Sequence, residues 1–214
     1  MKIPNYAFEH DKLRETNKVS RTGMYIRSDI AYTCAHYLEN DQSSCVTIYV
    51  GFPNKTKITG IRYYHQWSEL FSKDKTRDII NEAKKVEDIT SKWINQIKKE
   101  EMIIVGDFNV HNRAILANEE SKTPYEKSLN KISNIFKKNL CDNGMVIINK
   151  RNTYQSGLIK SDHDIQMTNR PEKIKNFGQD DYAPSDHSLL YLQRHMKIRN
   201  SEEQYIMYLC IVLQ

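Results

Sequence analysis

The stretch that decides the fold is Met102-Ile103-Ile104-Val105-Gly106-Asp107-Phe108-Asn109, an apolar strand followed at once by polar groups. Side chains alternate along an extended chain, so Asp107 and Asn109 point to one face and Phe108 to the other. In an open α/β sheet, ligands bind at the ends of buried strands. A carboxylate there suits a hard cation such as Mg²⁺, and a neighbouring amide can bind phosphate or position a water. The competing interpretation is a strand that runs into an Asx turn.

The composition is that of a globular chain with a mildly basic surface. The chain has 214 residues, of which 39% are hydrophobic and 28% charged, which suits one sizeable domain. Its net charge of +5 permits a polyanionic partner without requiring one. The sequence shows no signal peptide and no bilayer-spanning apolar run, and its four cysteines form no C-x-x-C pair. We therefore expect an intracellular protein, nuclear or cytoplasmic, that is not secreted and has no membrane partner.

Hydrophobic periodicity predicts two helices among runs of strands. Apolar residues at three- and four-residue spacing predict an amphipathic helix over 68–100 and a second over 125–140, which stops at Asn143-Gly144. Apolar or β-branched runs predict strands at 22–27 (continuing over 29–32), 46–50, 57–61, 102–105, 145–148, 165–168 and 188–192. The polar segments 39–44 and 151–161 are predicted to be a turn and a loop. Runs of strands with two helices indicate a layered α/β or α+β fold.

A second polar motif, Ser185-Asp186-His187, precedes the last predicted strand as a site loop would. A histidine next to a scissile phosphate can donate a hydrogen bond to it or, as imidazolium, stabilise its charge. Upstream, Asp164 leads into the strand at 165–168 and could orient His187 from behind, as a carboxylate orients an imidazole in other sites. A surface histidine and a turn-capping aspartate are the simpler interpretations of these two residues.

Together these motifs resemble the endonuclease/exonuclease/phosphatase superfamily, which is built like DNase I and exonuclease III. The family's Gly-Asp-x-Asn motif starts at Gly106 and its Ser-Asp-His motif at Ser185, in the expected order, whereas the Ser-x-x-Asp motif fits less well at Ser161. Within the superfamily, residues 20–195 are most similar to the endonuclease domain of LINE-type (non-LTR) retrotransposons. That similarity is carried by Arg21–Ile26, Gly60–Trp67 and Thr168–Pro171.

The resemblance implies an α/β (α+β) fold of DNase I type, a four-layer sandwich of two β-sheets flanked by helices. It also implies Mg²⁺-dependent (or Mn²⁺-dependent) hydrolysis of a phosphodiester in DNA, with no small-molecule cofactor. By the same resemblance, Asp107 orients or deprotonates the attacking water, and Asn109 positions this water and binds phosphate. The metal acts as a Lewis acid and as a template for in-line displacement.

The remaining site residues follow from the same resemblance. Asp186, with Asp107, lies at the metal, His187 contacts the scissile phosphate, and Asp164 lies behind His187. The site tyrosine is expected at Tyr64, because Tyr64 to Trp67 is similar to the Tyr-Arg-x-Trp of related elements. Tyr63 is the competitor, and an ordinary core or surface tyrosine is the alternative for both.

The N-terminus departs from the family pattern. Family members begin with two strands that carry an Asn and then the main metal-binding Glu, and both precede the region that matches Thr22–Ile26. Glu9 and Glu15 are present, but neither ends an apolar strand, so neither is assigned as a ligand. We therefore expect a domain over residues 1–199 that is partial at its N-terminus and lacks the first strands. An unmatched tail over 200–214 is expected to patch a surface or promote association.

Three functions are compatible with these residues. The first is a divalent-metal-dependent DNA endonuclease of retroelement type. The second is a catalytically inactive, truncated remnant that binds nucleic acid or a protein partner, which the missing Glu favours. The third is a phosphomonoesterase of the same superfamily. Target-site preference and oligomeric state do not follow from the sequence.

Overall fold

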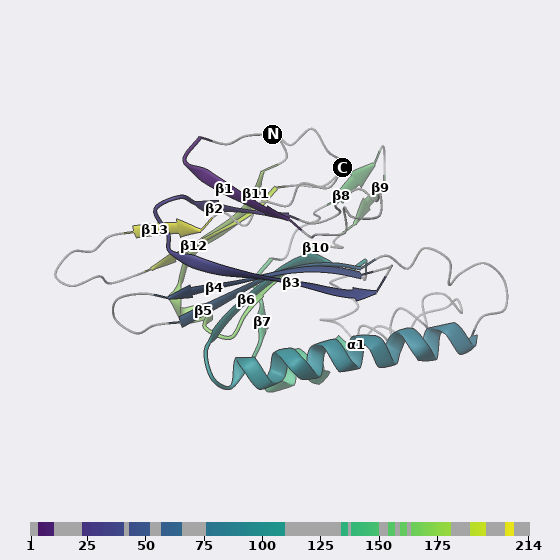
Figure 1. Ribbon diagram of the computed structural model, residues 1–214. Helices are drawn as coiled ribbons and strands as arrows, with labels where there is room; N and C mark the ends of the chain where they lie inside the picture. Colours follow the sequence, from purple (N-terminus) through teal and green to yellow (C-terminus); the bar gives the residue numbers. More distant parts are fainter. Residues whose placement is uncertain are drawn as a thin grey trace.

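A six-stranded mixed sheet, with the strand order β3-β4-β5-β6-β10-β7, forms the centre of the molecule. The long helix α1 (Thr76–Ile97) covers one face of this sheet, and two smaller sheets, β1-β2 and β11-β12-β13, lie over the other face (Figure 1). The protein is represented by a computed structural model. It describes residues 4–10, 23–40, 43–51, 57–65, 76–109, 134–136, 138–149, 154–156, 159–161, 164–180, 189–195 and 204–207.

The strands divide between the central sheet and its smaller neighbours. The central sheet contains β3 (Tyr32–Asn40), β4 (Ser43–Gly51), β5 (Lys57–His65), β6 (Glu101–Asp107), β7 (Val146–Ile147) and β10 (Asp164–Thr168). The smaller sheets contain β1 (Tyr6–His10), β2 (Gly23–Arg27), β11 (Ile174–Asp180), β12 (Leu189–His195) and β13 (Gln204–Met207). A separate hairpin pairs β8 (Tyr154–Ser156) with β9 (Ile159–Ser161), and two short 3-10 helices are η2 (Cys141–Asn143) and η3 (Pro171–Lys173).

Most predicted elements are confirmed in type and place. Helix α1 lies within the helix predicted over 68–100, and residues 134–136 and 138–140 of the second predicted helix are helical. The predicted stop at Asn143-Gly144 is also confirmed, because Gly144 ends η2 with a left-handed φ of 95°. The strands that match predictions are β2, β4, β5, β6, β7, β10 and β12.

Three local predictions are wrong. Residues 29–32 do not continue β2, because the Asp29 carboxylate receives two hydrogen bonds of 2.6 Å from the Arg27 guanidinium across a turn. The turn predicted over 39–44 is too wide, because the β3–β4 ladder extends as far as the pair Asn40 and Ser43 and leaves only the residues between them to connect the strands. The segment 151–161 contains the β8–β9 hairpin rather than a loop alone.

Side-chain alternation gives the central sheet two separate cores. On the helix side, Val86, Ile89 and Trp93 of α1 pack against the sheet. On the other side, Ile103 and Val105 of β6 pack in one cluster with residues of β2 and β12. A side chain on the face of Ile103 and Val105 therefore lies between the central sheet and the smaller sheets.

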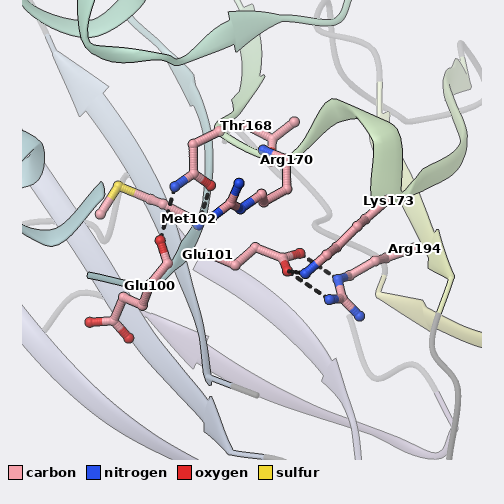
Figure 2. A network of polar contacts seen from close by, with 8 residues as sticks. Glu100, Glu101, Met102, Thr168, Arg170, Lys173 and Arg194 are labelled. Atoms are coloured by element: carbon pink, nitrogen blue, oxygen red, sulfur yellow. Dashed lines mark hydrogen bonds and ion pairs between the residues drawn. The ribbon is translucent and has the colours of Figure 1, made fainter. Parts of the chain in front are cut away.

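Glu101, the first residue of β6, ties these two layers together. Its buried carboxylate accepts hydrogen bonds from Nε and Nη2 of Arg194 on β12, and from Nζ of Lys173 at 3.1 Å (Figure 2). Beside it, the Asn169 side chain acts as a strand partner: Oδ1 accepts from the Met102 N–H at 2.8 Å, and Nδ2 donates to the Glu100 carbonyl at 2.9 Å. These contacts fix the end of β6 that lies opposite Asp107.

The remaining described segments add two points. β13 lies in the predicted tail and pairs with β12, so this part of the tail forms the third strand of the sheet β11-β12-β13. Among the described helices, none combines the length and apolar character needed to cross a membrane.

Candidate active site

Three of the predicted site residues lie in one row across neighbouring strands. Tyr64 on β5 is the register partner of Asp107 on β6, and Asp107 is the register partner of Asp164 on β10. Helix α1 connects β5 to β6 as a crossover, so the two strands are parallel and their carboxyl ends meet at one edge of the sheet. β10 runs antiparallel to β6, so it brings its first residue, Asp164, to the same edge.

This row faces the space between the central sheet and the smaller sheets. Asp107 follows Ile103 and Val105 at the two-residue period of β6, and both of these belong to the core between the sheets. Register partners in a ladder point to the same face, so Tyr64 and Asp164 face the same layer. Both carboxylate residues are buried: Asp107 is 2% exposed and Asp164 is 0% exposed.

Tyr63 points the other way, into the helix-side core. Its ring is fully buried and lies edge-on to Trp93 with 5.3 Å between ring centroids. Its hydroxyl is 3.2 Å from Nδ1 of His65. Of the two tyrosines considered for the site, Tyr64 is therefore the one that shares a face with the carboxylates.

Asn109 ends the strand in the Asx turn that was the competing interpretation of this stretch. Its backbone adopts a left-handed φ of 51°, which asparagine tolerates better than most residues. Its N–H donates to Oδ1 of Asp107 at 2.8 Å, and its Nδ2 donates to the His65 carbonyl at the end of β5. The turn and the site are compatible, because the turn holds Asn109 beside Asp107 and joins the ends of β5 and β6.

The backbone of β5 passes so close to Gly106 that only a glycine fits at this position of the motif. A Cβ at this position would lie 2.1 Å from the Tyr63 carbonyl oxygen, well inside any real contact. The close approach of β5 and β6 at this point, which sets Tyr64 beside Asp107, therefore requires a residue without a side chain.

Two further buried polar residues lie beside the row and were missed by the sequence analysis. Asn149, 5% exposed, donates from Nδ2 to the Asp164 carbonyl at 2.7 Å and accepts from the Gln166 N–H at 2.6 Å. The available signal was a polar amide directly after the apolar strand 145–148, the same pattern that singled out Asn109.

The second missed residue is Arg62, a charged side chain buried inside β5. It precedes Tyr64 by two residues, so it points to the same face, and it is 1% exposed. Burial lowers the pKa of the Arg62 guanidinium, and the Asp164 and Asp107 carboxylates act in the opposite direction. The signal was a basic residue inside an otherwise apolar and aromatic strand.

The motif Ser185-Asp186-His187 lies outside the described residues, but the direction of the strand that follows it is known. Near the end of β12, Arg194 contacts Glu101, and nearer its start, the Tyr191 carbonyl accepts a hydrogen bond of 3.3 Å from Nε2 of Gln166. Gln166 is two residues from Asp164. The start of β12 is therefore directed towards the Asp107 end of the central sheet.

Glu9 lies at the other end of the sheet. Its Oε1 accepts a hydrogen bond of 2.7 Å from the Tyr32 hydroxyl. Tyr32 pairs with Val50, Val50 with Ile58, and Ile58 with Glu101, so this row crosses the start of β6. At about 3.3 Å per residue, Glu101 and Asp107 are roughly 20 Å apart. Glu15 lies outside the described residues.

Within the part of the chain that the structure describes, no cluster of three or more His, Cys, Asp or Glu side chains forms a metal site. The adjacent carboxylates of Asp107 and Asp164 still fit a hard divalent cation, which prefers oxygen donors. This donor set can also hold and polarise a water molecule.

No protein-family model matches the chain, and no curated protein matches its sequence. Solved structures do match its fold. The endonuclease domain of TRAS1, a telomere-specific non-LTR retrotransposon, aligns with a TM-score of 0.56 and 13% identity, over 87% of this chain and 76% of that domain. AP endonuclease LMAP from Leishmania major aligns with a TM-score of 0.59 and 11% identity, over 87% and 69% of the two chains.

A third similar structure is an endonuclease/exonuclease/phosphatase family protein from Bacteroides thetaiotaomicron, with a TM-score of 0.51 and 9% identity, over 86% of this chain and 73% of that one. At these identities the likeness concerns the fold. The chain therefore has the mixed α/β fold of the endonuclease/exonuclease/phosphatase superfamily, as the motifs of its sequence predicted.

Proposed function

We propose that this chain is a divalent-metal-dependent phosphodiesterase that cleaves DNA, an endonuclease of the retroelement type. The observation that carries the proposal is the register row in which Tyr64, Asp107 and Asp164 meet at one end of the central sheet. Motif residues from three separate segments of the sequence converge there, as a hydrolytic site requires. The TRAS1 endonuclease domain, whose fold is similar, supports the choice of DNA as substrate.

In this proposal each polar group has a separate task. Asp107 holds the attacking water and accepts its proton, and Asn109 positions the water and the phosphate. His187 contacts the scissile phosphate, with Asp164 behind it. Asp107 and Asp186 would hold Mg²⁺ or Mn²⁺, which supplies Lewis-acid stabilisation of the phosphate charge when bound. Tyr64 lies on the substrate side of Asp107.

The proposal also includes the complete four-layer sandwich. The described residues form three layers, namely α1, the central sheet and the two smaller sheets. A second helical layer on the outer face of the smaller sheets would complete the arrangement that the sequence motifs imply.

The test is nicking of supercoiled plasmid by the full chain with Mg²⁺ and with EDTA. We expect nicking with Mg²⁺ and none with EDTA, and Asp107→Asn should lower the rate by about 100-fold or more, because it removes the general base. Asp88→Asn, which changes an exposed carboxylate on α1, should nick at the wild-type rate.

Other results would identify the other two functions. Folded wild-type protein that does not nick but binds DNA, with an affinity that falls steeply with salt, would contradict the enzyme and indicate a binding protein. Metal-dependent release of phosphate from a phosphomonoester without plasmid nicking would indicate the phosphatase.

A further inference from the structure

Arg62 lies directly beneath the row of candidate site residues. It pairs with Val46 on one side and Val105 on the other, so it occupies the neighbouring row between the sheets. Val105 is in turn the partner of Gln166 on β10, two residues from Asp164. The guanidinium therefore lies on the interior side of the carboxylates, at 1% exposure and away from solvent.

Most of the N–H groups of the Arg62 guanidinium have no hydrogen-bond acceptor among the described residues. Nη1 donates to the Tyr63 carbonyl, whereas Nε and Nη2 have no hydrogen-bond partner among the described residues. A guanidinium has five N–H donors and stays protonated in proteins. Because burying an unpaired cation is very unfavourable, a nearby negative charge must balance it.

Asp164 and Asp107 are the carboxylates that interact electrostatically with Arg62. The two carboxylates are in turn stabilised by this cation, because they repel each other. They are directly opposite each other on antiparallel strands, where Cβ atoms are about 4.5–5.5 Å apart and like charges destabilise the ladder. Arg62 therefore offsets one of the two negative charges, and both carboxylates are attracted to the same cation.

We propose that Arg62 is the positioning residue of the candidate site, a permanent positive charge that holds the carboxylates of Asp107 and Asp164 side by side from the interior. The protein itself thus supplies the counter-charge that keeps the pair assembled before any metal or substrate binds. The catalytic meaning of this arrangement rests on the proposed function, but the charge arrangement does not.

The first test is the sign of one substitution measured in EDTA. If two adjacent carboxylates had no cation beneath them, Asp164→Asn would relieve their repulsion and raise the melting temperature. With Arg62 in place, Asp164→Asn removes a counter-charge from a buried cation, so we expect the melting temperature to fall by roughly 5 °C or more. Asp107→Asn should shift it in the same direction.

The second test is a double-mutant cycle of Arg62→Met and Asp164→Asn, again in EDTA. Each single variant should lower the melting temperature, and the double variant should lose clearly less than the sum of the two. Arg62→Lys, which keeps the charge, should recover at least half of the loss seen in Arg62→Met. A residue that only fills space would show no such rescue.

Arg194 provides the matched control for the cycle. It is also a buried arginine between the same two layers, but its partner is Glu101 at the opposite end of β6. Arg194→Met should lower the melting temperature, yet its shift should add in full to that of Asp164→Asn because the sites are independent.

Two results would overturn the proposal. One is a rise in melting temperature for Asp164→Asn in EDTA. The other is full additivity of Arg62→Met with Asp164→Asn. If Arg62→Met does not fold, the sign of the two Asp→Asn shifts decides alone. Neither measurement uses metal or DNA, so a failure of plasmid nicking and a failure of this proposal are separate outcomes.

Discussion

At the scale of single residues, the clearest division is between Tyr63 and Tyr64. They are adjacent in sequence, but the alternation of β5 sends Tyr63 into the helix-side core and Tyr64 towards the carboxylates. A hydroxyl beside Asp107 can contact substrate, whereas the Tyr63 hydroxyl lies beside His65 inside the core.

Replacement of each tyrosine by phenylalanine tests this division. Tyr64→Phe should lower the plasmid-nicking rate by about 10- to 100-fold with an unchanged melting temperature, since it removes a polar contact to the substrate. Tyr63→Phe should leave nicking nearly unchanged and cost roughly 1 kcal/mol of stability, because it removes a buried hydrogen bond. Loss of nicking in Tyr63→Phe, together with normal nicking in Tyr64→Phe, would show that Tyr63 is the site residue.

Motif reasoning named candidate residues at strand ends but not the buried polar residues that lie beside them. Asp107, Asn109 and Asp164 could be predicted because each stands where an apolar strand begins or ends. Arg62 and Asn149 could not, because their importance depends on what lies across the sheet. A basic residue within a strand is usually on a solvated face, and only the layer of β2 and β12 makes that face an interior one.

At the scale of elements, the site depends on how closely β5 and β6 approach. Gly106→Ala should destabilise the protein by about 3 kcal/mol or prevent folding, because the new methyl group would overlap the Tyr63 carbonyl. Gly51→Ala is the matched control, since nothing lies within 4 Å of its Cβ position, and it should change stability by less than about 0.5 kcal/mol. Urea denaturation measures both, and equal effects would contradict the close approach.

Three of the strands that the sequence analysis missed share a physical reason. β3, β11 and β13 each lie at an edge of their sheet, where a strand has one partner and needs little apolar surface. Phe177, for example, is 43% exposed in β11. The strands between two covered faces, such as β5 and β6, are nearly continuously buried, and their composition made them predictable.

At the scale of the whole molecule, the Glu101 cluster joins the central sheet to the smaller sheets. Its two cations differ in burial, because the Arg194 side chain is 6% exposed and that of Lys173 is 40% exposed. We expect Arg194→Met to cost about 3–5 kcal/mol, since it leaves a buried carboxylate without its main partner. Lys173→Met should cost no more than about 1 kcal/mol. Chemical denaturation checks this order, and similar costs for both would contradict it.

The side chains of Asn149 and Asn169 make hydrogen bonds to the backbone at the two ends of β10, and this limits which changes in length the strand can accept. Asn149 holds the start of β10 at Asp164, and Asn169, just after its end, holds the backbone at Met102. A one-residue insertion inside this strand would turn Asp164 to the opposite face and place Ile165 in the row, and a one-residue deletion would also turn Asp164 away from the row. Because all five residues of β10 are also buried, length changes are compatible with the proposed activity only outside 164–168. An engineered one-residue insertion or deletion within 164–168 should therefore abolish the proposed activity.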